Sequence, residues 1–334
     1  MPHSDHLSRR GFLNQSIIAA GGAGALAAGS VARAQETPAQ PGAPSVPADM
    51  ASRMPYATIG KAKISRLMLG GNLVSGYLHC RDLKYVHSLF RAYVTEQKMM
   101  ETMALAEKCG INTVFETGVS FVEKYNKQFN GKMQFLPHIK VDKDQTEAEL
   151  KDHIKAQVDT GAVALYVWGV ASDTLMATGR PELIGRAVEL AKLHNLPVGV
   201  GSHSLLVPME CEKRQVPCDF YVKTLHSDNY PSATPRELRK EFIWLTGGKG
   251  WYDNMWCINP EETIAFMKTV NKPWIAFKVL AAGAFTPQEG FNYAFQNGAD
   301  LIAVGMFDFQ IQANCQLMQR VVREHQKRER PWFA

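Results

Sequence analysis

Short apolar runs alternate with helix-like segments from residue 56 to residue 330, and this alternation constrains the fold more than any other feature of the chain. A hairpin predicted over residues 56–69 leads into the first strand. The other predicted strands are residues 111–116, 133–140, 163–168, 197–201, 220–225, 274–278 and 301–304. Short apolar runs bounded by turn signals are typical of strands buried on both faces of a parallel sheet.

Helical patterns fill most of the intervals between these runs. The predicted helices are residues 95–108, 120–129, 146–160, 181–194, 261–270, 287–297 and 310–324. Thr95 is a suitable N-cap, and Thr146 with Glu149 has the pattern of a capping box. Strands that alternate with helices in one domain predict an α/β fold, a (β/α)8 TIM barrel, with long loops after strands 1 and 6. Chemistry in such a barrel is confined to the loops at the carboxyl ends of the strands.

Residues 1–34 have the pattern of a twin-arginine signal peptide. Arg9 and Arg10 precede Phe12, a weakly apolar Ala/Gly run follows, and residues 32–34 form a small-x-small cleavage site. The apolar run is too short and too rich in glycine for a stable membrane span. We therefore expect the twin-arginine export machinery as a partner, and a periplasmic or extracellular location.

The remaining chain divides into a linker and one domain. Residues 35–55 are rich in Pro, Ala and Ser and predict a flexible linker before the barrel at residues 56–330. The formal net charge is +5 and the basic residues are dispersed, so we expect no nucleic-acid partner. The basic run at residues 327–330 is interpreted as a solvated helix end. Cys211 and Cys218 flank a short loop and could oxidise after export.

Several motifs resemble the aldo/keto reductase family. Residues 54–60 (MPYATIG), 64–67 (ISRL) and 69–71 (LGG) are similar to its opening hairpin and first strand. The motifs CGINT at 109–113, GVGS at 199–202 and KVLAAG at 278–283 are similar to its strands 2, 5 and 7. The resemblance covers about residues 54–320. It implies a TIM barrel and, in the family, an Asp-Tyr-Lys-His tetrad that acts with a nicotinamide cofactor.

The tetrad of that family is not preserved in this chain. The family Asp corresponds to Glu116, the Tyr to Phe121, the Lys to Lys140, and the His to the Trp168–Gly169 position. Phe121 has no proton to give to a carbonyl, so ordinary carbonyl reduction is not expected. The family binds the cofactor phosphates on loops after strands 7 and 8, but no Lys or Arg lies between residues 279 and 319 here. NADP is therefore not the expected cofactor.

Ionisable and aromatic side chains lie at the ends of the predicted strands instead. They are Glu116, His138, Lys140, Trp168, His203, Lys223, His226 and Lys278. Burying many charged groups costs free energy unless they are paired, so the whole set predicts an active site. Any one of them can also be explained alone as a structural residue, held by an ion pair or a backbone carbonyl.

A metal centre is the first chemistry that fits this set. His138, His203 and His226 are predicted to bind a divalent metal ion of unknown identity. His203 and His226 should approach each other, because they follow adjacent strands. The metal ion would leave coordination positions open for substrate oxygens.

A reactive lysine is the second chemistry that fits. Lys278 and Lys140 are predicted to face one pocket, so that at least one has a depressed pKa, with Lys278 as the reactive group and Lys140 beside Glu116. Lys223 is a further catalytic candidate. A lysine of this kind forms a Schiff base or acts as a base. Both chemistries imply proton abstraction next to a carbonyl.

Two long loops suggest the substrate. The loop after strand 1 carries His79 and Arg81, and the loop after strand 6 carries Trp251 and Trp256. Tryptophans among polar residues are typical of surfaces that stack sugar rings, so we expect a carbohydrate, with Trp168 as a further contact. Trp251 and Trp256 are expected to contribute to substrate affinity and little to stability.

The sequence therefore predicts an exported enzyme that acts on a sugar or polyol carbonyl compound by proton abstraction. The reaction class is isomerase, epimerase, lyase or hydratase. Two alternatives remain open: a reductase with a tightly bound nicotinamide cofactor, and a non-catalytic barrel that binds a solute.

Overall fold

The computed structural model describes residues 46–81, 83, 85–116, 119–241 and 254–334. The predicted signal peptide and Trp251 lie outside the described residues. Within the described ranges, no helix is both long enough and apolar enough to cross a membrane.

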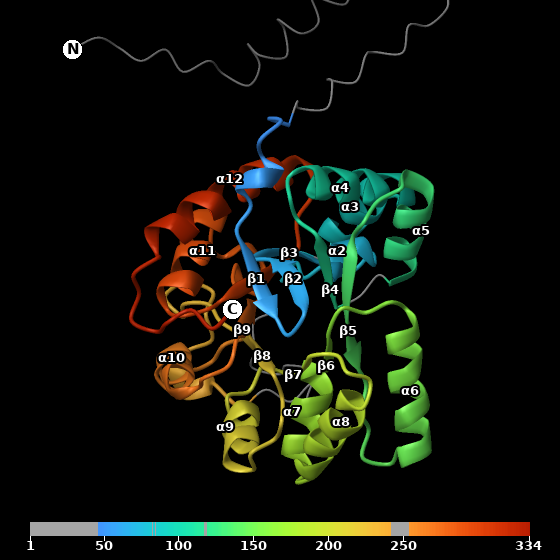
Figure 1. The fold of residues 1–334 in the computed structure, drawn as a ribbon. Helices are drawn as coiled ribbons and strands as arrows, with labels where there is room; N and C mark the ends of the chain where they lie inside the picture. Colours follow the sequence, from blue (N-terminus) through green and yellow to red (C-terminus); the bar gives the residue numbers. More distant parts are fainter. Residues whose placement is uncertain (1–45, 82, 84, 117–118, 242–253) are drawn as a thin grey trace, which may run out of the picture. The chain divides into compact units, whose positions relative to one another are not determined.

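Eight parallel strands form one closed barrel, in the order β10-β3-β4-β5-β6-β7-β8-β9 (Figure 1). Their bounds are β3 (Leu67–Gly70), β4 (Thr113–Glu116), β5 (Gln134–Ile139), β6 (Leu165–Val167), β7 (Val198–Ser202), β8 (Phe220–Thr224), β9 (Trp274–Phe277) and β10 (Leu301–Val304). The pairing of β10 with β3 closes the ring. The TIM barrel predicted from the alternating pattern is confirmed.

Helices surround this barrel (Figure 1). The predicted ones are α4 (Glu96–Lys108), α5 (Val119–Phe129), α6 (Glu147–Asp159), α8 (Glu182–Lys192), α10 (Pro260–Thr269), α11 (Pro287–Gln296) and α12 (Asp308–Glu324). The sequence did not predict α2 (Gly71–Val74), α3 (Tyr85–Tyr93), α7 (Gly169–Ala177) or α9 (Leu206–Lys213), nor the 3-10 turns η1 (Ala51–Arg53), η2 (Arg236–Leu238) and η4 (Ala281–Gly283). The Thr95 cap and the capping box of Thr146 and Glu149 are confirmed.

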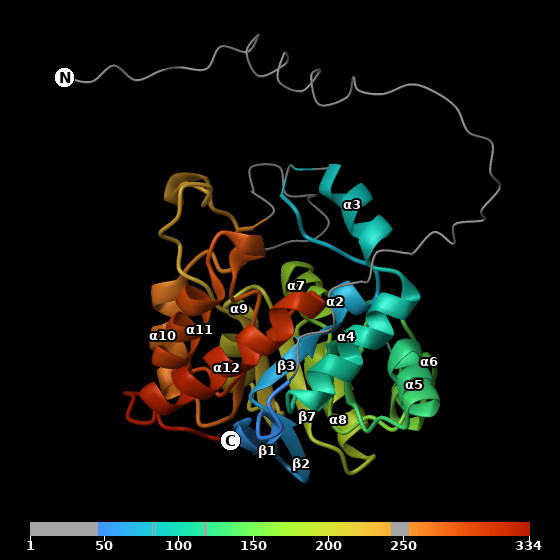
Figure 2. The same ribbon diagram turned by 90° about the horizontal axis from the view of Figure 1, so that it is seen from above.

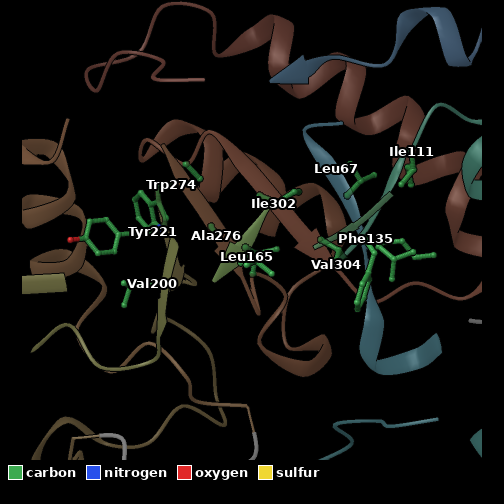
Figure 3. Close-up of a cluster of buried hydrophobic side chains, with 14 of the residues drawn as sticks. Leu67, Ile111, Phe135, Leu165, Val200, Tyr221, Trp274, Ala276, Ile302 and Val304 are labelled. Atoms are coloured by element: carbon green, nitrogen blue, oxygen red, sulfur yellow. The ribbon is translucent and has the colours of Figure 1, made fainter. Parts of the chain in front are cut away.

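Buried apolar side chains form two layers, one on each face of the barrel wall. The outer layer, between strands and helices, includes Leu67, Phe135, Leu165, Tyr221 and Trp274 (Figure 3). The inner layer, inside the barrel, includes Met68, Leu136, Tyr166, Phe220 and Val222. Consecutive residues of a strand enter different layers, because their side chains point to opposite faces of the sheet.

A hairpin closes the amino end of the barrel. It consists of β1 (Tyr56–Ile59) and β2 (Ala62–Ser65), and its apolar side chains join the inner layer. Figure 2 shows the hairpin and the C-terminus at one end of the barrel and α3 at the opposite end. The carboxyl ends of the strands, on the side of α3, are thus the end at which a site can form.

Asp300 holds the last residues of the chain against the amino end of the barrel. Its buried carboxylate lies 2.9 Å from Nη2 of Arg328 and 2.9 Å from Nη1 of Arg330. Arg330 also donates to the carbonyls of Met267 and Gly298. The interpretation of residues 327–330 as a solvated helix end is therefore wrong for both arginines, because α12 ends at Glu324 and the chain turns back onto the barrel.

The folded part of the chain begins before residue 56. Met50 and Met54, which the sequence analysis placed in the linker, are buried in the outer layer. Nε2 of Gln319 donates to the carbonyl of Met50 at 3.1 Å. Cys211 and Cys218 are buried free thiols, so they form no disulfide in this structure.

Candidate active site

A cavity of about 580 Å³ lies at the carboxyl ends of the strands. Residues at or next to the carboxyl end of every barrel strand except β8 line it, together with two loop residues, His79 and Trp256. The strand-end residues are Gly70, Glu116, His138, Trp168, His203, Lys278 and Gly305. A cavity of this size holds a small molecule. This is also the end of a TIM barrel where active sites are found.

Lys278 is the lysine that the structure places in the cavity. It follows β9 with a positive φ of 57°, a conformation that costs free energy for a residue with a side chain. Its Nζ lies 2.8 Å from Nε2 of His79 and 3.8 Å from the centroid of the Trp256 ring. The ammonium group is thus fixed between an imidazole and an indole face, an arrangement that favours its charge through the cation–π contact.

Glu116 supplies the carboxylate of the cavity. It ends β4 with a φ of 81°, and its Oε1 accepts a hydrogen bond of 3.0 Å from Nε1 of Trp168. Burial raises the pKa of Glu116, while the charge of Lys278 and the Trp168 hydrogen bond act in the opposite direction. A carboxyl group with a raised pKa gains and loses a proton closer to neutral pH than an ordinary one.

The predicted position of Lys140 is wrong. Lys140 is exposed, does not line the cavity, and its backbone N–H donates to Nε2 of His153 at 3.0 Å. Strand β5 ends at Ile139, so the alternation that would direct residue 140 inward no longer applies. The lysine whose charge acts on Glu116 is Lys278, not Lys140.

Lys223 is buried but does not line the cavity. Its Nζ donates to the carbonyl of Thr224 at 3.1 Å and to Oγ1 of Thr224 at 2.9 Å. The neighbouring inward positions of β8 are Phe220 and Val222, so residue 223 belongs to the opposite face of the strand. The structure therefore does not place Lys223 among the residues that line the cavity.

His138 lies in the cavity wall and stacks on Trp168. The two ring centroids are 5.1 Å apart and the planes differ by 19°. Burial, with help from the nearby charges of Lys140 and His153, lowers the pKa of His138 to about 4, so the ring is neutral near pH 7. Its buried Nδ1 has no hydrogen-bond partner among the described residues.

His226 is held by backbone groups on both ring nitrogens. Nε2 accepts hydrogen bonds of 2.9 Å from the backbone N–H groups of Trp256 and Cys257, and Nδ1 donates to the carbonyl of Ser227 at 2.8 Å. Burial lowers the pKa of His226 to about 4. The neutral ring thus fixes the backbone at Trp256 and Cys257. Its one lone pair, on Nε2, already accepts these two hydrogen bonds and is not available to a metal ion.

Within the described residues, His138, His203 and His226 do not come together as a set of metal ligands. His203 uses Nδ1 to contact Asp173, and His226 uses both nitrogens for the backbone. Across the described part of the chain, no group of three His, Cys, Asp or Glu residues is arranged to hold a metal ion. A shared metal needs lone pairs that converge on one point, and strand order alone did not predict the directions of these rings.

Asp173 is the site residue that the sequence analysis missed. It lies on α7, directly after β6, and is 1% exposed. Its Oδ2 lies 2.8 Å from Nδ1 of His203, and its carboxylate accepts the backbone N–H groups of His203 and Ser204. An aspartate within the otherwise uncharged segment GVASDTLMA was the available signal.

The predicted substrate contacts divide into three groups. His79, Trp168 and Trp256 line the cavity. Arg81 is exposed and is not part of the cavity wall; its Nη1 lies 3.4 Å from Oγ of Ser232. Trp251 lies outside the described residues. Trp256 is 8% exposed, so it is also a packed residue, contrary to the expectation that it affects affinity alone.

Comparison with protein families and with curated proteins finds no match. Among solved structures, the chain is similar to a protein assigned as an aldo-keto reductase from Pseudomonas aeruginosa, at 11% identity over 80% of this chain and 95% of that one, with a TM-score of 0.52. It is also similar to a truncated 3-deoxy-D-arabino-heptulosonate 7-phosphate synthase from Thermotoga maritima, at 10% identity over 85% and 97% of the two chains, with a TM-score of 0.49. At 11% identity, the likeness to the first of these structures shows a shared fold alone.

Proposed function

We propose that the protein is an enzyme that moves a proton on the carbon next to the carbonyl of a small sugar or polyol. The observation that carries this proposal is the position of Lys278, whose Nζ lies in the cavity 2.8 Å from Nε2 of His79. Glu116 lines the same cavity and feels the charge of Lys278. An amine, a base for that amine and a separate carboxyl group are the parts that such a reaction requires.

His79 and Lys278 perform the first step. The imidazole accepts a proton from the Lys278 ammonium, which leaves a neutral amine with a lone pair. This lone pair attacks the carbonyl carbon, the carbonyl oxygen takes one proton from the amine and one from the His79 imidazolium and leaves as water, and an iminium ion forms. The positive iminium nitrogen withdraws electrons from the neighbouring C–H bond and so acidifies it.

Glu116 performs the proton transfer. Its carboxylate takes the acidified proton, and the C–H electron pair forms the double bond of an enamine. Return of the proton to the opposite face of the same carbon, followed by hydrolysis of the iminium, releases an epimer and restores the Lys278 amine. No redox partner is needed, because every electron pair stays within the substrate and Lys278.

The aromatic wall supports a small polyol as substrate. Trp168 has one face against His138, and Trp256 has one face against the Lys278 ammonium. The remaining faces and edges of these rings line the cavity, where they can contact the C–H surface of a sugar. The volume of about 580 Å³ sets the size class of the ligand.

We also propose that the chain is exported to the periplasm by the twin-arginine route. The support is the order of Arg9, Arg10, Phe12 and the cleavage site at residues 32–34. Cell fractionation of the full chain tests this proposal. A double variant with Arg9→Lys and Arg10→Lys should remain in the cytoplasm, and equal secretion of both forms would refute this route.

Hydrogen exchange in D2O tests the enzymatic proposal. The full chain is incubated with a panel of short ketoses and aldoses that starts with dihydroxyacetone, and loss of the C–H signal next to the carbonyl is followed by NMR. Lys278→Met should abolish the catalysed exchange, whereas Lys140→Met, a lysine outside the cavity, should retain it. Equal exchange in both variants would contradict the role of Lys278. A nicotinamide absorbance band in the purified protein would favour the reductase alternative.

A further inference from the structure

Asp173 is a buried carboxylate that takes no part in the steps proposed for Lys278, His79 and Glu116. It is 1% exposed, and a buried carboxylate costs free energy unless it receives hydrogen bonds. The backbone N–H of His203 lies 3.1 Å from Oδ1 and 3.0 Å from Oδ2, and the N–H of Ser204 lies 3.0 Å from Oδ1. These donors fix the orientation of the carboxylate relative to the His203 ring and favour its ionised form.

The ring of His203 is fixed by the same carboxylate. Its Nδ1 lies 2.8 Å from Oδ2 of Asp173, a short contact between two buried atoms. When Nδ1 carries the proton and donates it to Asp173, the lone pair of the neutral ring lies on Nε2. With Asp173 ionised, the geometry fixes the His203 proton on Nδ1.

His203 lies beside the reactive lysine. It follows β7, lines the cavity, and its ring centroid lies 5.6 Å from that of Trp256 and 5.3 Å from that of Phe277. Burial and the nearby charges of Lys278, Lys223 and His79 lower the pKa of His203 well below its usual range. The ring is therefore neutral near pH 7, and a partner carboxylate that stabilises the imidazolium is what allows such a ring to accept a proton.

We infer that Asp173 is a positioning residue that fixes His203 as a second proton-transfer group of the cavity, an inference that rests on the proposed function. Glu116 serves one face of the carbon next to the Lys278 iminium and Nε2 of His203 serves the opposite face, where it takes the proton while the C–H electron pair forms the enamine double bond. The imidazolium that results is stabilised by the Asp173 carboxylate and returns its proton in the reverse step. Asp173 keeps its own charge throughout and touches no substrate atom.

A competing arrangement makes this inference testable. Burial raises the pKa of the Asp173 carboxyl, against the opposite effects of the backbone donors and Lys223, while Glu241 adds to the rise. Burial is the largest of these effects and brings the pKa of Asp173 to about 8, and a protonated Asp173 would donate to Nδ1 and force the His203 proton onto Nε2. The two arrangements place the His203 proton on different nitrogens.

Nitrogen NMR of isotope-labelled histidine in the full chain distinguishes the two arrangements without any substrate. The wild-type protein should show His203 with its proton on Nδ1. Asp173→Asn can turn its amide N–H toward Nδ1 and should move the proton to Nε2. A wild-type ring protonated on Nε2 would overturn the inference, and this measurement stands even if the variant does not fold.

The second readout is catalysis by the same variant. Asp173→Asn should lower the exchange of one of the two hydrogens on each carbon next to the carbonyl of dihydroxyacetone by about 100-fold, the usual scale of one acid–base group, yet retain the exchange served by Glu116 and the borohydride-dependent labelling of Lys278. Ser172→Ala removes a neighbouring buried hydroxyl on α7 and should leave both signals unchanged. Unchanged exchange in Asp173→Asn would overturn the inference. If the wild-type protein shows neither exchange nor labelling, the proposed function is refuted. The NMR measurement of the His203 tautomer would still show whether Asp173 positions that ring.

Discussion

The Nζ atom of Lys278 and the Nε2 atom of His79 lie 2.8 Å apart, although 199 positions separate the two residues in the chain. Lys278 follows β9, and His79 lies in the loop after β3. In the closed barrel only β10 separates β9 from β3, so closure of the barrel brings the pair together. The reactive group of the proposed enzyme thus exists only in the folded barrel.

His79→Phe should slow the labelling of Lys278. The substitution keeps a ring of similar size but removes the nitrogen that accepts the Lys278 proton. We expect the borohydride-dependent labelling rate to fall by about 100-fold, measured by mass spectrometry over time. Arg81→Gln, on the same loop but outside the cavity wall, is the control. A wild-type rate in His79→Phe would show that this ring does not assist the amine.

Trp256→Ala should reduce both stability and labelling. The ring is buried and contacts His79, His203 and Lys278, so its removal leaves a cavity and frees the lysine. We expect a loss of about 3–5 kcal/mol in the free energy of unfolding, measured with urea. Tyr85→Ala, at an exposed ring on α3, should change stability little. Full stability in Trp256→Ala would show that the ring is only a substrate contact.

The stability of the fold should fall as the pH decreases from about 6.5 to about 4, in part because of His226. The pKa of this histidine is about 4 in the folded protein and 6.5 in an exposed reference state, so only the unfolded chain binds the proton in this window. Proton binding stabilises the unfolded state relative to the folded state by up to about 3 kcal/mol as a result. His226→Gln should therefore show a smaller pH dependence in urea unfolding, whereas the exposed His194→Gln should match the wild type. If the free energy of unfolding changed with pH equally in all three proteins, His226 would not be a source of this pH dependence.

Asp300→Asn should destabilise the barrel strongly. Asp300 accepts hydrogen bonds from two buried guanidinium groups, those of Arg328 and Arg330, and an amide would place a donor against a donor. Breaking a buried ion pair costs about 3–5 kcal/mol. Glu329→Gln disrupts the exposed pair with Lys268 in the same tail and should cost less than about 1 kcal/mol. Urea unfolding of both variants tests the contrast, and equal losses would contradict it.

The fold was predictable because its signals are local. Helix caps such as Thr146 with Glu149, and short apolar runs at regular intervals, directly specify where helices and strands begin. The positions of Lys278, Glu116, His138 and His203 followed from one rule, that the carboxyl ends of barrel strands meet at one rim.

Side-chain direction was harder to predict than strand order. Lys223 could have been assigned to the outer face from its neighbours Phe220 and Val222, but Lys140 depends on β5 ending one residue earlier, at Ile139. His226 and Asp173 depend on backbone N–H groups of other segments, which carry no sequence signal. Tertiary hydrogen bonds thus decided which polar residues are structural and which line the cavity.

The most direct test of the account is a covalent trap on Lys278. The full chain is incubated with dihydroxyacetone and sodium borohydride, which reduces an iminium ion to a stable amine, and the labelled peptide is identified by mass spectrometry. We predict one labelled lysine, Lys278, with no labelling at this position in Lys278→Met and normal labelling in Lys140→Met. Labelling spread evenly over exposed lysines, with none at Lys278, would contradict the central claim.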